Sequence, residues 1–130
     1  MIGYATVGVN DLERAYRFYD ALFAEVGGKR LMALPGDPRG FTLYGTGMDR
    51  PMVAITRPYD DGPASPGNGA MIALAADDRG QVDALHAKAL ELGGSDEGAP
   101  GLRAPEEMGF YGAYWRDPDG NKFCAFKVGQ

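Results

Sequence analysis

The sequence predicts an α+β fold made of two tandem βαβββ modules. The first observation is the order of its elements, because a strand, a helix and three further short strands are expected twice in succession. The second is a set of positions that repeat at an offset of 66 residues: Gly3, Asp11 and Gly27-Gly28 in the first module, and Gly69, Asp77 and Gly93-Gly94 in the second. Matching Tyr4 to Met71 gives an offset of 67 instead, which indicates a one-residue insertion or deletion between the modules.

The first module opens with a strand expected over residues 4–9. Asn10 is predicted to cap the following helix, with Glu13 three residues later completing a capping box. Apolar residues recur at helical spacing from Leu12 to Val26, and a glycine pair then ends the helix. Three short strands separated by turns rich in Gly, Pro and Asp are expected at residues 30–34, 41–44 and 52–56.

The second module repeats this pattern, beginning with a strand expected over residues 69–76. Asp78 and Gln81 are predicted to be the N-cap of its helix and the residue three positions later. A second apolar stripe runs from Val82 to Leu92 and ends at a glycine pair. Strands are then expected at residues 95–97, 110–116 and 122–128.

A tight turn joins the last two of these strands. Pro118 fixes the φ angle that an early turn position needs, and Gly120 and Asn121 tolerate the positive φ where the chain reverses. Asp117 can accept a hydrogen bond from the backbone two residues further on. The stretch from Phe110 to Phe126 is therefore predicted to be a β-hairpin.

The modules are predicted to form one domain over residues 1–130. The first module covers residues 1–57 and the second covers residues 68–130. Residues 58–67 join them in a polar, turn-rich segment that is expected to be a linker. In each module the helix should cover one face of the sheet and leave the other open, so that two modules side by side form a trough for a small molecule.

Composition excludes several classes of function. The net charge is −5 and the basic residues are scattered, so no basic stripe is available to bind nucleic acid. The apolar runs are too short to span a membrane, and no signal peptide precedes the first strand. A single cysteine, Cys124, allows no disulfide within the chain, and we expect a cytoplasmic protein.

The chain resembles the vicinal oxygen chelate superfamily, which includes glyoxalase I, bleomycin-resistance proteins and extradiol dioxygenases. The resemblance rests on the strand before residues 10–19, on residues 66–69 before the second module, on residues 101–103, and most specifically on residues 111–121. It implies that the paired modules form an incomplete, curved barrel with an interior cavity. In metal-dependent members that cavity binds a divalent ion, which acts as a Lewis acid.

The resemblance also implies where metal ligands would be found. Histidines are usual early in the first strand of each module, where this chain has Tyr4 and Met71, and a glutamate is usual where it has Cys124. A different site built from Tyr4, Met71 and Cys124 is an alternative, but one thiol, one thioether and one phenol are a poor ligand set for zinc. We therefore expect no metal cofactor, and we expect His86 to be an ordinary helix residue at the edge of the apolar stripe.

We expect the cavity to bind a ligand through aromatic and sulfur-containing side chains. The predicted ligand-binding residues are Tyr4, Tyr44, Met52, Met71, Phe110, Tyr111, Tyr114, Cys124 and Phe126. Cys124 could instead be a nucleophile, but no base is placed to activate it, so a buried and unreactive thiol is favoured. Glu106 and Glu107 could do acid–base chemistry, although a solvated loop is the simpler interpretation.

Two functions follow from these observations. The first is metal-free binding of a small molecule, similar to the sequestration of a drug by bleomycin-resistance proteins. The alternative is a lyase, isomerase or dioxygenase of the same family, acting on an aromatic or thiol-conjugated substrate with or without a metal. The resemblance further implies a homodimer in which residues 58–67 could act as a hinge for exchange of a module.

Overall fold

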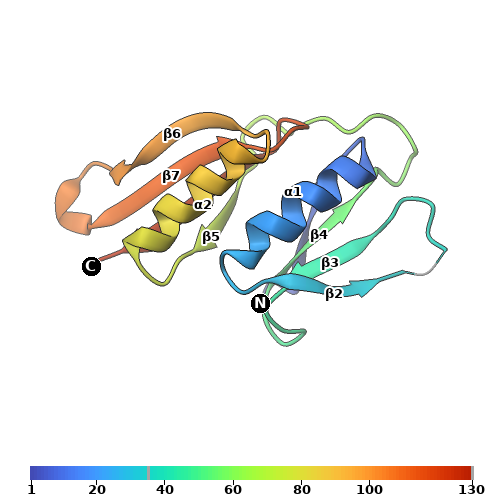
Figure 1. The fold of residues 1–130 in the computed structure, drawn as a ribbon, viewed down its shortest axis with the longest axis horizontal. Helices are drawn as coiled ribbons and strands as arrows, with labels where there is room; N and C mark the ends of the chain where they lie inside the picture. The colour runs from blue at the N-terminus through green and yellow to red at the C-terminus, as the bar shows by residue number, and fades with distance from the viewer. Residues whose placement is uncertain (35, 130) are drawn as a thin grey trace. The chain divides into compact units, whose positions relative to one another are not determined.

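The computed structural model describes residues 1–34 and 36–129, and its chain divides into two units, Met1–Pro66 and Gly67–Gln130 (Figure 1). The boundary lies inside the segment predicted to be the linker. Each unit contains one helix and one four-stranded sheet.

The first unit contains the predicted strand, helix and three strands. These elements are β1 (Tyr4–Gly8), α1 (Leu12–Ala24), β2 (Lys29–Ala33), β3 (Thr42–Gly45) and β4 (Met52–Thr56). The strand order is β1-β4-β3-β2, with β1 parallel to β4 and the other pairs antiparallel. The first and last strands of the unit are thus neighbours, joined by the helical crossover that a parallel pair requires.

The second unit has the same topology. Its elements are β5 (Ile72–Ala75), α2 (Arg79–Glu91), β6 (Ser95–Leu102), the short 3₁₀ helix η1 (Glu106–Met108), β7 (Phe110–Arg116) and β8 (Lys122–Val128). The strand order is β5-β8-β7-β6, and neither sheet closes on itself over the described residues. The predicted fold class of two βαβββ modules is confirmed.

Strand β6 is longer than the sequence predicted. The expected strand covered residues 95–97, whereas β6 continues to Leu102 through Gly98 and Pro100. Its register against β7 shifts between Asp96 and Gly98 and again before Gly101. Such irregularities insert extra residues into an edge strand. The alternation of apolar and polar residues that predicts a strand is then interrupted.

Helix α1 covers one face of the first sheet (Figure 1). The Tyr44 ring on β3 lies 5.3 Å from the Phe23 ring and 6.3 Å from the Tyr19 ring on this helix. Val7 and Ile55 are buried, and the alternation of side chains along β1 and β4 places them on the same face. The opposite face of the sheet, here called the open face of the first unit, carries Tyr4, Thr6, Leu43, Met52 and Ala54.

Helix α2 covers the second sheet in the same way. Tyr111 of β7 donates a hydrogen bond to Asp83 of α2, with 2.6 Å between the oxygens, so odd-numbered residues of β7 face the helix. Trp115 and Phe123 are fully buried on this side, with their rings stacked at 6.1 Å. The other face, the open face of the second unit, carries Phe110, Tyr114, Cys124 and Phe126.

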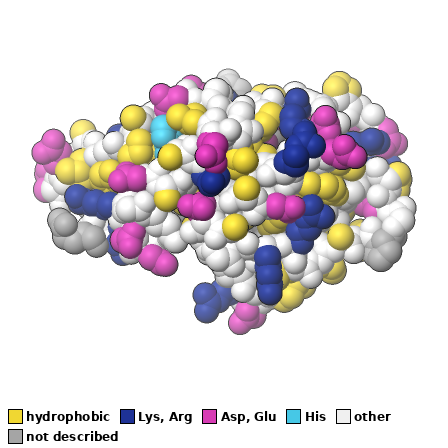
Figure 2. Space-filling view, viewed as in Figure 1, with side chains coloured by type: hydrophobic (Ala, Val, Ile, Leu, Met, Phe, Trp, Pro, Cys, Tyr) yellow, Lys and Arg dark blue, Asp and Glu magenta, His cyan; other side chains and the backbone are white. Residues whose placement is uncertain are grey.

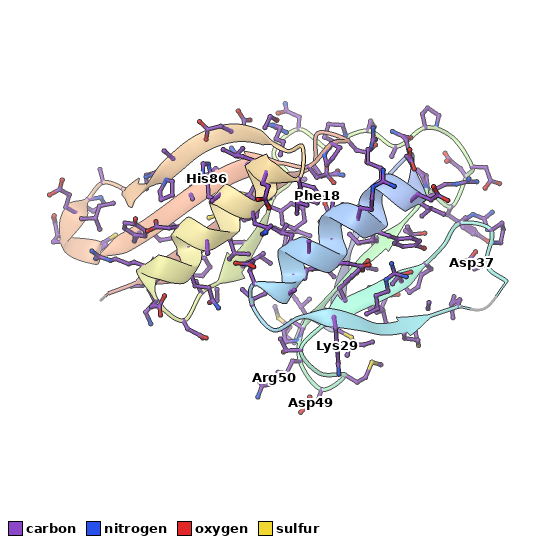
Figure 3. All side chains as sticks on the ribbon, viewed as in Figure 1. Phe18, Lys29, Asp37, Asp49, Arg50 and His86 are labelled. Carbon is purple, nitrogen blue, oxygen red and sulfur yellow. The ribbon has the colours of Figure 1, made fainter. Side chains whose placement is uncertain are left out.

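His86 belongs to α2, as expected, but it is more enclosed than the edge of a stripe would be. The residue is 7% exposed, and its Nε2 lies 2.9 Å from Asp96 Oδ1 on β6. This hydrogen bond lowers the pKa of Asp96. His86 therefore ties the second helix to an edge strand, and Figure 3 shows it on α2.

One of the two predicted helix caps is confirmed and the other is wrong. Asp78 caps α2 as predicted, accepting a 2.8 Å hydrogen bond from the Gln81 backbone. The cap of α1 is Asp11, which accepts from the Arg14 backbone at 3.1 Å, so the assignment of this role to Asn10 was wrong. The Asn10 side chain is used elsewhere, in a contact with Ala64 described below.

Both helices end in the same arrangement. Gly28 N donates to Phe23 O and Gly94 N donates to Ala89 O, and the distance is 2.8 Å in both hydrogen bonds. The preceding glycines, Gly27 and Gly93, have positive φ angles of 74° and 101°. The offset between units is 67 residues at the N-caps, so Asp11 corresponds to Asp78 and its match with Asp77 was wrong. The offset is 66 at these glycines and at the carbonyls of Phe23 and Ala89, so the one-residue difference lies within the helices.

The turn between β7 and β8 also has the predicted form. The Asp117 carboxylate accepts hydrogen bonds from the backbone N–H groups of Asp119 and Asn121, at 2.9 and 2.8 Å. Gly120 has a φ of 91°, as its place in the turn requires.

Charged side chains of both signs are interspersed on the face shown in Figure 2, which has no continuous basic stripe. Within residues 1–34 and 36–129, neither helix has the length and hydropathy of a membrane span.

Candidate functional site

A cavity of about 600 Å³ opens on the first unit. It is lined by Thr6, Gly8, Leu34, Asp37, Arg39, Phe41, Thr56, Arg57, Pro58, Tyr59, Asp60, Pro63, Ala64 and Ser65. The lining begins on the open face, where β1 and β4 end, and continues into the segment after β4. In Figure 3 Asp37 marks this end of the sheet, whereas Asp49 and Arg50 mark the β3–β4 turn at the opposite end.

Asp37 organises the connection between β2 and β3. One carboxylate oxygen accepts the Arg39 backbone N–H at 3.1 Å and the other accepts the Phe41 backbone N–H at 3.2 Å. The Phe41 ring is thereby held over the open face, where it meets the Tyr4 ring edge-on with 5.7 Å between centroids. The apolar wall of the cavity is continuous with the open face through this contact.

Arg39 links that connection to the segment after β4. Its Nε donates to Tyr59 O at 2.9 Å, and one terminal nitrogen lies 3.3 Å from an Asp61 carboxylate oxygen. Its guanidinium also lies 4.8 Å from the centroid of the Tyr59 ring, a cation–π arrangement. Residues 59–61 are in this way fixed against the β2–β3 connection.

Asn10 fixes the later part of the same segment. Its Oδ1 accepts the Ala64 backbone N–H at 2.7 Å, and its Nδ2 donates to Ala64 O at 3.3 Å. A single side chain thus binds both polar groups of one backbone residue. Residues 58–65, which the sequence predicted to be part of a linker, form a wall of the cavity and belong to the first unit.

Arg57 is the charged residue of the cavity with the fewest partners. Its guanidinium makes no ion pair and no hydrogen bond with any residue in the described ranges, unlike that of Arg39. It lines the large cavity and also a neighbouring one of about 280 Å³. An unpaired guanidinium in a cavity wall can bind an acidic or strongly polar group of a ligand. No sequence motif marked this residue, because its role depends on how residues 58–65 fold back.

The predicted ligand-binding residues of the first unit separate onto two faces. Tyr4 and Met52 share the open face, as predicted. Tyr44 does not, because β3 turns Leu43 toward the open face and Tyr44 toward α1. Tyr44 is 1% exposed, its hydroxyl donates to Asp20 at 2.7 Å, and burial raises its pKa. Tyr44 therefore does not lie with Tyr4 and Met52, although it was predicted to bind the ligand with them.

Asp20 explains why a tyrosine occupies that buried position. It accepts two hydrogen bonds from the Arg30 guanidinium, at 2.8 and 2.7 Å, as well as the one from Tyr44. The bond from Arg30 lowers the pKa of Asp20. This group joins α1 to β2 and β3, so its role is structural.

In the second unit most of the predicted residues do lie together. Phe110, Tyr114, Cys124 and Phe126 share the open face, and the Phe110 and Phe126 rings stack at 5.4 Å. Met71 precedes β5 and is 46% exposed. Tyr111 is the exception: its hydroxyl reaches Asp83 on α2, so it lies on the covered face and is removed from the predicted site.

Cys124 has the environment expected of an unreactive thiol. It is 1% exposed, and burial raises its pKa, which disfavours the thiolate. The carboxylates of Glu106 and Glu107 belong to the exposed helix η1.

A family model of the glyoxalase/bleomycin resistance protein/dioxygenase superfamily matches residues 1–125. The chain belongs to this superfamily. Among solved structures it is similar to a glyoxalase/bleomycin resistance protein from Albidiferax ferrireducens T118, with 38% identity, 98% of each chain covered and a TM-score of 0.83. A search of curated proteins found no match.

Two more distant solved structures have names that state a function. TnmS3, an antibiotic binding protein from Streptomyces sp. CB03234, is 23% identical, with 99% of this chain and 96% of that chain covered and a TM-score of 0.68. A glyoxalase I mutant from Zea mays is 25% identical, with 96% of this chain but 44% of that chain covered and a TM-score of 0.69. The likeness to TnmS3 shows the fold alone.

The resemblance implies that Tyr4, Met71 and Cys124 stand at the family's usual metal-ligand positions. Tyr4 offers a phenol that is half exposed, Met71 offers a thioether, and Cys124 offers a thiol whose pKa is raised. Zinc and related ions are bound mainly by thiolates, imidazoles and carboxylates, so a phenol, a thioether and a buried thiol are a poor set of donors for such an ion. Over residues 1–34 and 36–129 no group of three or more His, Cys, Asp or Glu is clustered closely enough to hold a metal.

Proposed function

We propose that this glyoxalase-superfamily protein binds a small, partly aromatic compound in the cavity of the first unit and holds it without a chemical step. The observation that carries the proposal is the cavity itself. Its volume of about 600 Å³ falls in the range of known small-molecule sites, roughly 300–1,000 Å³. The donor chemistry of Tyr4, Met71 and Cys124, which is a poor ligand set for zinc, supports binding without a metal.

Different lining residues would contact the apolar and the polar parts of a bound compound. Leu34 and Phe41 supply apolar surface, and the exposed Tyr59 ring can cover a bound compound from the side of residues 58–65. Arg57 supplies an unpaired positive charge. The compound that fits best therefore combines an aromatic or aliphatic body with one acidic or polar group.

An enzyme of the same superfamily is the alternative, because the superfamily includes glyoxalases and dioxygenases. A lyase, isomerase or dioxygenase of the usual kind would retain a divalent metal. Dialysis followed by elemental analysis distinguishes the two functions. One equivalent of nickel, zinc, iron or manganese per chain would reject metal-free sequestration.

The Arg57→Gln variant tests the cavity. In a thermal-shift screen of small aromatic and thiol-conjugated acids, compounds that bind the folded protein raise its melting temperature. We expect Arg57→Gln to weaken the best compound about tenfold, since one charge-assisted hydrogen bond is lost. The matched control is Arg50→Gln, which removes the same charge at the opposite end of the sheet (Figure 3) and should leave affinity unchanged. Equal binding by the parent and Arg57→Gln would show that the ligand does not use this cavity.

We also predict a homodimer. Both open faces expose large apolar side chains, with Tyr4 at 52% and Met71 at 46% exposure, and burial of such groups favours association. Residues 58–65 are fixed to the first unit, so a hinge for module exchange would be confined to the few residues after them. Light scattering should give twice the chain mass, and a monomer at micromolar concentration would contradict this prediction.

A further inference from the structure

A tight turn at residues 67–70 leads into β5. Ala70 N donates to Gly67 O at 3.1 Å, so Asn68 and Gly69 are the two central residues of this turn. Gly69 has a φ of 92°, as the second central position of a type II turn requires. Neither central residue belongs to a helix or a strand, so a local opening of the turn costs little free energy.

Asn68 differs from the other two asparagines of the sequence in the freedom of its side chain. Asn10 binds both polar groups of Ala64, and the Asn121 amide donates to Asp117 at 2.9 Å. Asn68 is exposed, and its amide makes no hydrogen bond with any residue in the described ranges. Its side chain can therefore rotate toward the main chain that follows it.

The backbone nitrogen of Gly69 is free in the same way. Among residues 1–34 and 36–129 it has no hydrogen-bond acceptor, and a Cβ built on Gly69 would meet nothing within 4 Å. A glycine also leaves the main chain the freedom to bring this nitrogen to the carbonyl carbon of the preceding side chain. The two atoms belong to neighbouring residues, so a reaction between them is intramolecular and has a high effective concentration.

Glycine follows aspartate at two other places in the sequence, and there the glycine nitrogen is engaged. These glycines are Gly62 and Gly120. Gly62 N donates to Asp60 Oδ1 and Gly120 N donates to Asp117 O, and the distance is 2.9 Å in both hydrogen bonds. Each nitrogen would have to break its hydrogen bond before it could attack a side chain, which the nitrogen of Gly69 need not do.

We propose that Asn68 is a site of spontaneous deamidation through a cyclic imide. The Gly69 nitrogen attacks Asn68 Cγ, so that an N–Cγ bond forms and the Cγ–Nδ2 bond breaks. Nδ2 leaves as ammonia and carries away the proton that the Gly69 nitrogen releases. Water then opens the imide at either of its two carbonyls, which gives aspartate or isoaspartate. The reaction consumes water, releases ammonia and needs no oxidant or cofactor.

The products differ from the parent in charge and, for isoaspartate, in the length of the main chain. Either product carries a carboxylate, so the net charge becomes one unit more negative than −5. Isoaspartate also inserts one carbon into the main chain between Gly67 and Ala70, the two residues whose hydrogen bond closes the turn. Residue 68 does not line the cavity of the first unit, so this inference does not rest on the function proposed above.

The test follows freshly purified full-length protein during incubation at mildly alkaline pH. Digestion and mass spectrometry should find a mass gain of about one dalton at Asn68, because an amide becomes a carboxyl group. The rate there should exceed the rates at Asn10 and Asn121 at least about tenfold, since those two side chains are held. It should rise with pH, because the Gly69 nitrogen must lose its proton to attack. Methylation by a protein-isoaspartate methyltransferase identifies the isoaspartate.

Asn68→Gln is the decisive variant. Glutamine keeps the amide, but its extra carbon enlarges the ring that must form, so the gain of negative charge seen by isoelectric focusing should slow at least about tenfold. Residue 68 is exposed, so this substitution should leave the folded structure intact.

Denatured protein provides the control for the argument from the glycine nitrogens. Guanidinium chloride removes the hydrogen bonds of Gly62 and Gly120, so isoaspartate should then form at Asp61 and Asp119 as well. In the folded protein it should be confined to residue 68. Isoaspartate at Asp61 or Asp119 of the folded protein would contradict the argument.

Three further results would overturn the proposal. The folded protein could show no mass gain at Asn68 under conditions in which a synthetic peptide of residues 65–71 deamidates, which would mean that the turn protects the amide. Asn10 or Asn121 could react as fast as Asn68. Asn68→Gln could gain negative charge at the rate of the parent, which would place the reaction elsewhere in the chain.

Discussion

The Asp117→Ala protein is expected to be about 2–4 kcal/mol less stable than the parent, the sum of losing several hydrogen bonds at one buried carboxylate. Asp117 is 3% exposed, and its oxygens accept from the backbones of Asp119 and Asn121 and, at 2.9 Å, from the Asn121 side chain. Alanine removes these three hydrogen bonds from the turn that joins β7 and β8. Urea denaturation measures the change in the free energy of unfolding.

Asp117→Asn is the conservative control for this prediction. The asparagine oxygen can still accept both backbone N–H groups, whereas the new amide nitrogen cannot accept from the Asn121 side chain. We expect a cost of about 1 kcal/mol for this variant. Stability equal to the parent in the alanine variant would mean that the carboxylate does not organise the turn.

The Gly94→Ala protein is expected to lose about 3 kcal/mol, because overpacking against backbone cannot be relieved by a rotamer change. A Cβ at this position would lie 2.6 Å from Arg116 O and 2.8 Å from Ala89 O. The chain must therefore move where α2 passes to β6. Thermal and urea unfolding would both detect this loss.

Gly3→Ala provides the comparison, since a Cβ on Gly3 meets nothing within 4 Å and the change should stay within about 0.5 kcal/mol. Gly28→Ala, at the equivalent place in the first unit, should fall between the two, because its nearest backbone neighbour, Phe23 O, is 3.1 Å away. Equal effects at Gly28 and Gly94 would contradict the steric argument.

Most of the architecture could be predicted from the sequence because the patterns that indicate it are local. Helical spacing, strand alternation and the paired glycines each operate within a few residues, and they placed both helices and nearly every strand. The first helix cap was misassigned because Asn10 and Asp11 are both good caps. The choice between them depends on Ala64, 54 residues away, which no local pattern can reveal.

The candidate site could be predicted less completely from the sequence, because it depends on contacts between residues far apart in the chain. Tyr44 and Tyr111 were included for their aromatic character, but each is turned to a helix by the parity of its strand. Residues 58–65 have the composition of a linker, and only their contacts with Asn10 and Arg39 make them a cavity wall. The sequence identified suitable side chains but could not say which of them share a face.

The pairing of the first strand with the last in each unit has a consequence for how such a chain could arise. Every strand pair, from β1 with β4 to β5 with β8, is formed within its own unit. A break between Pro66 and Gly67 would separate no two hydrogen-bonded strands. Fusing two copies of an ancestral gene for one such unit end to end would therefore require no new β-sheet pairing.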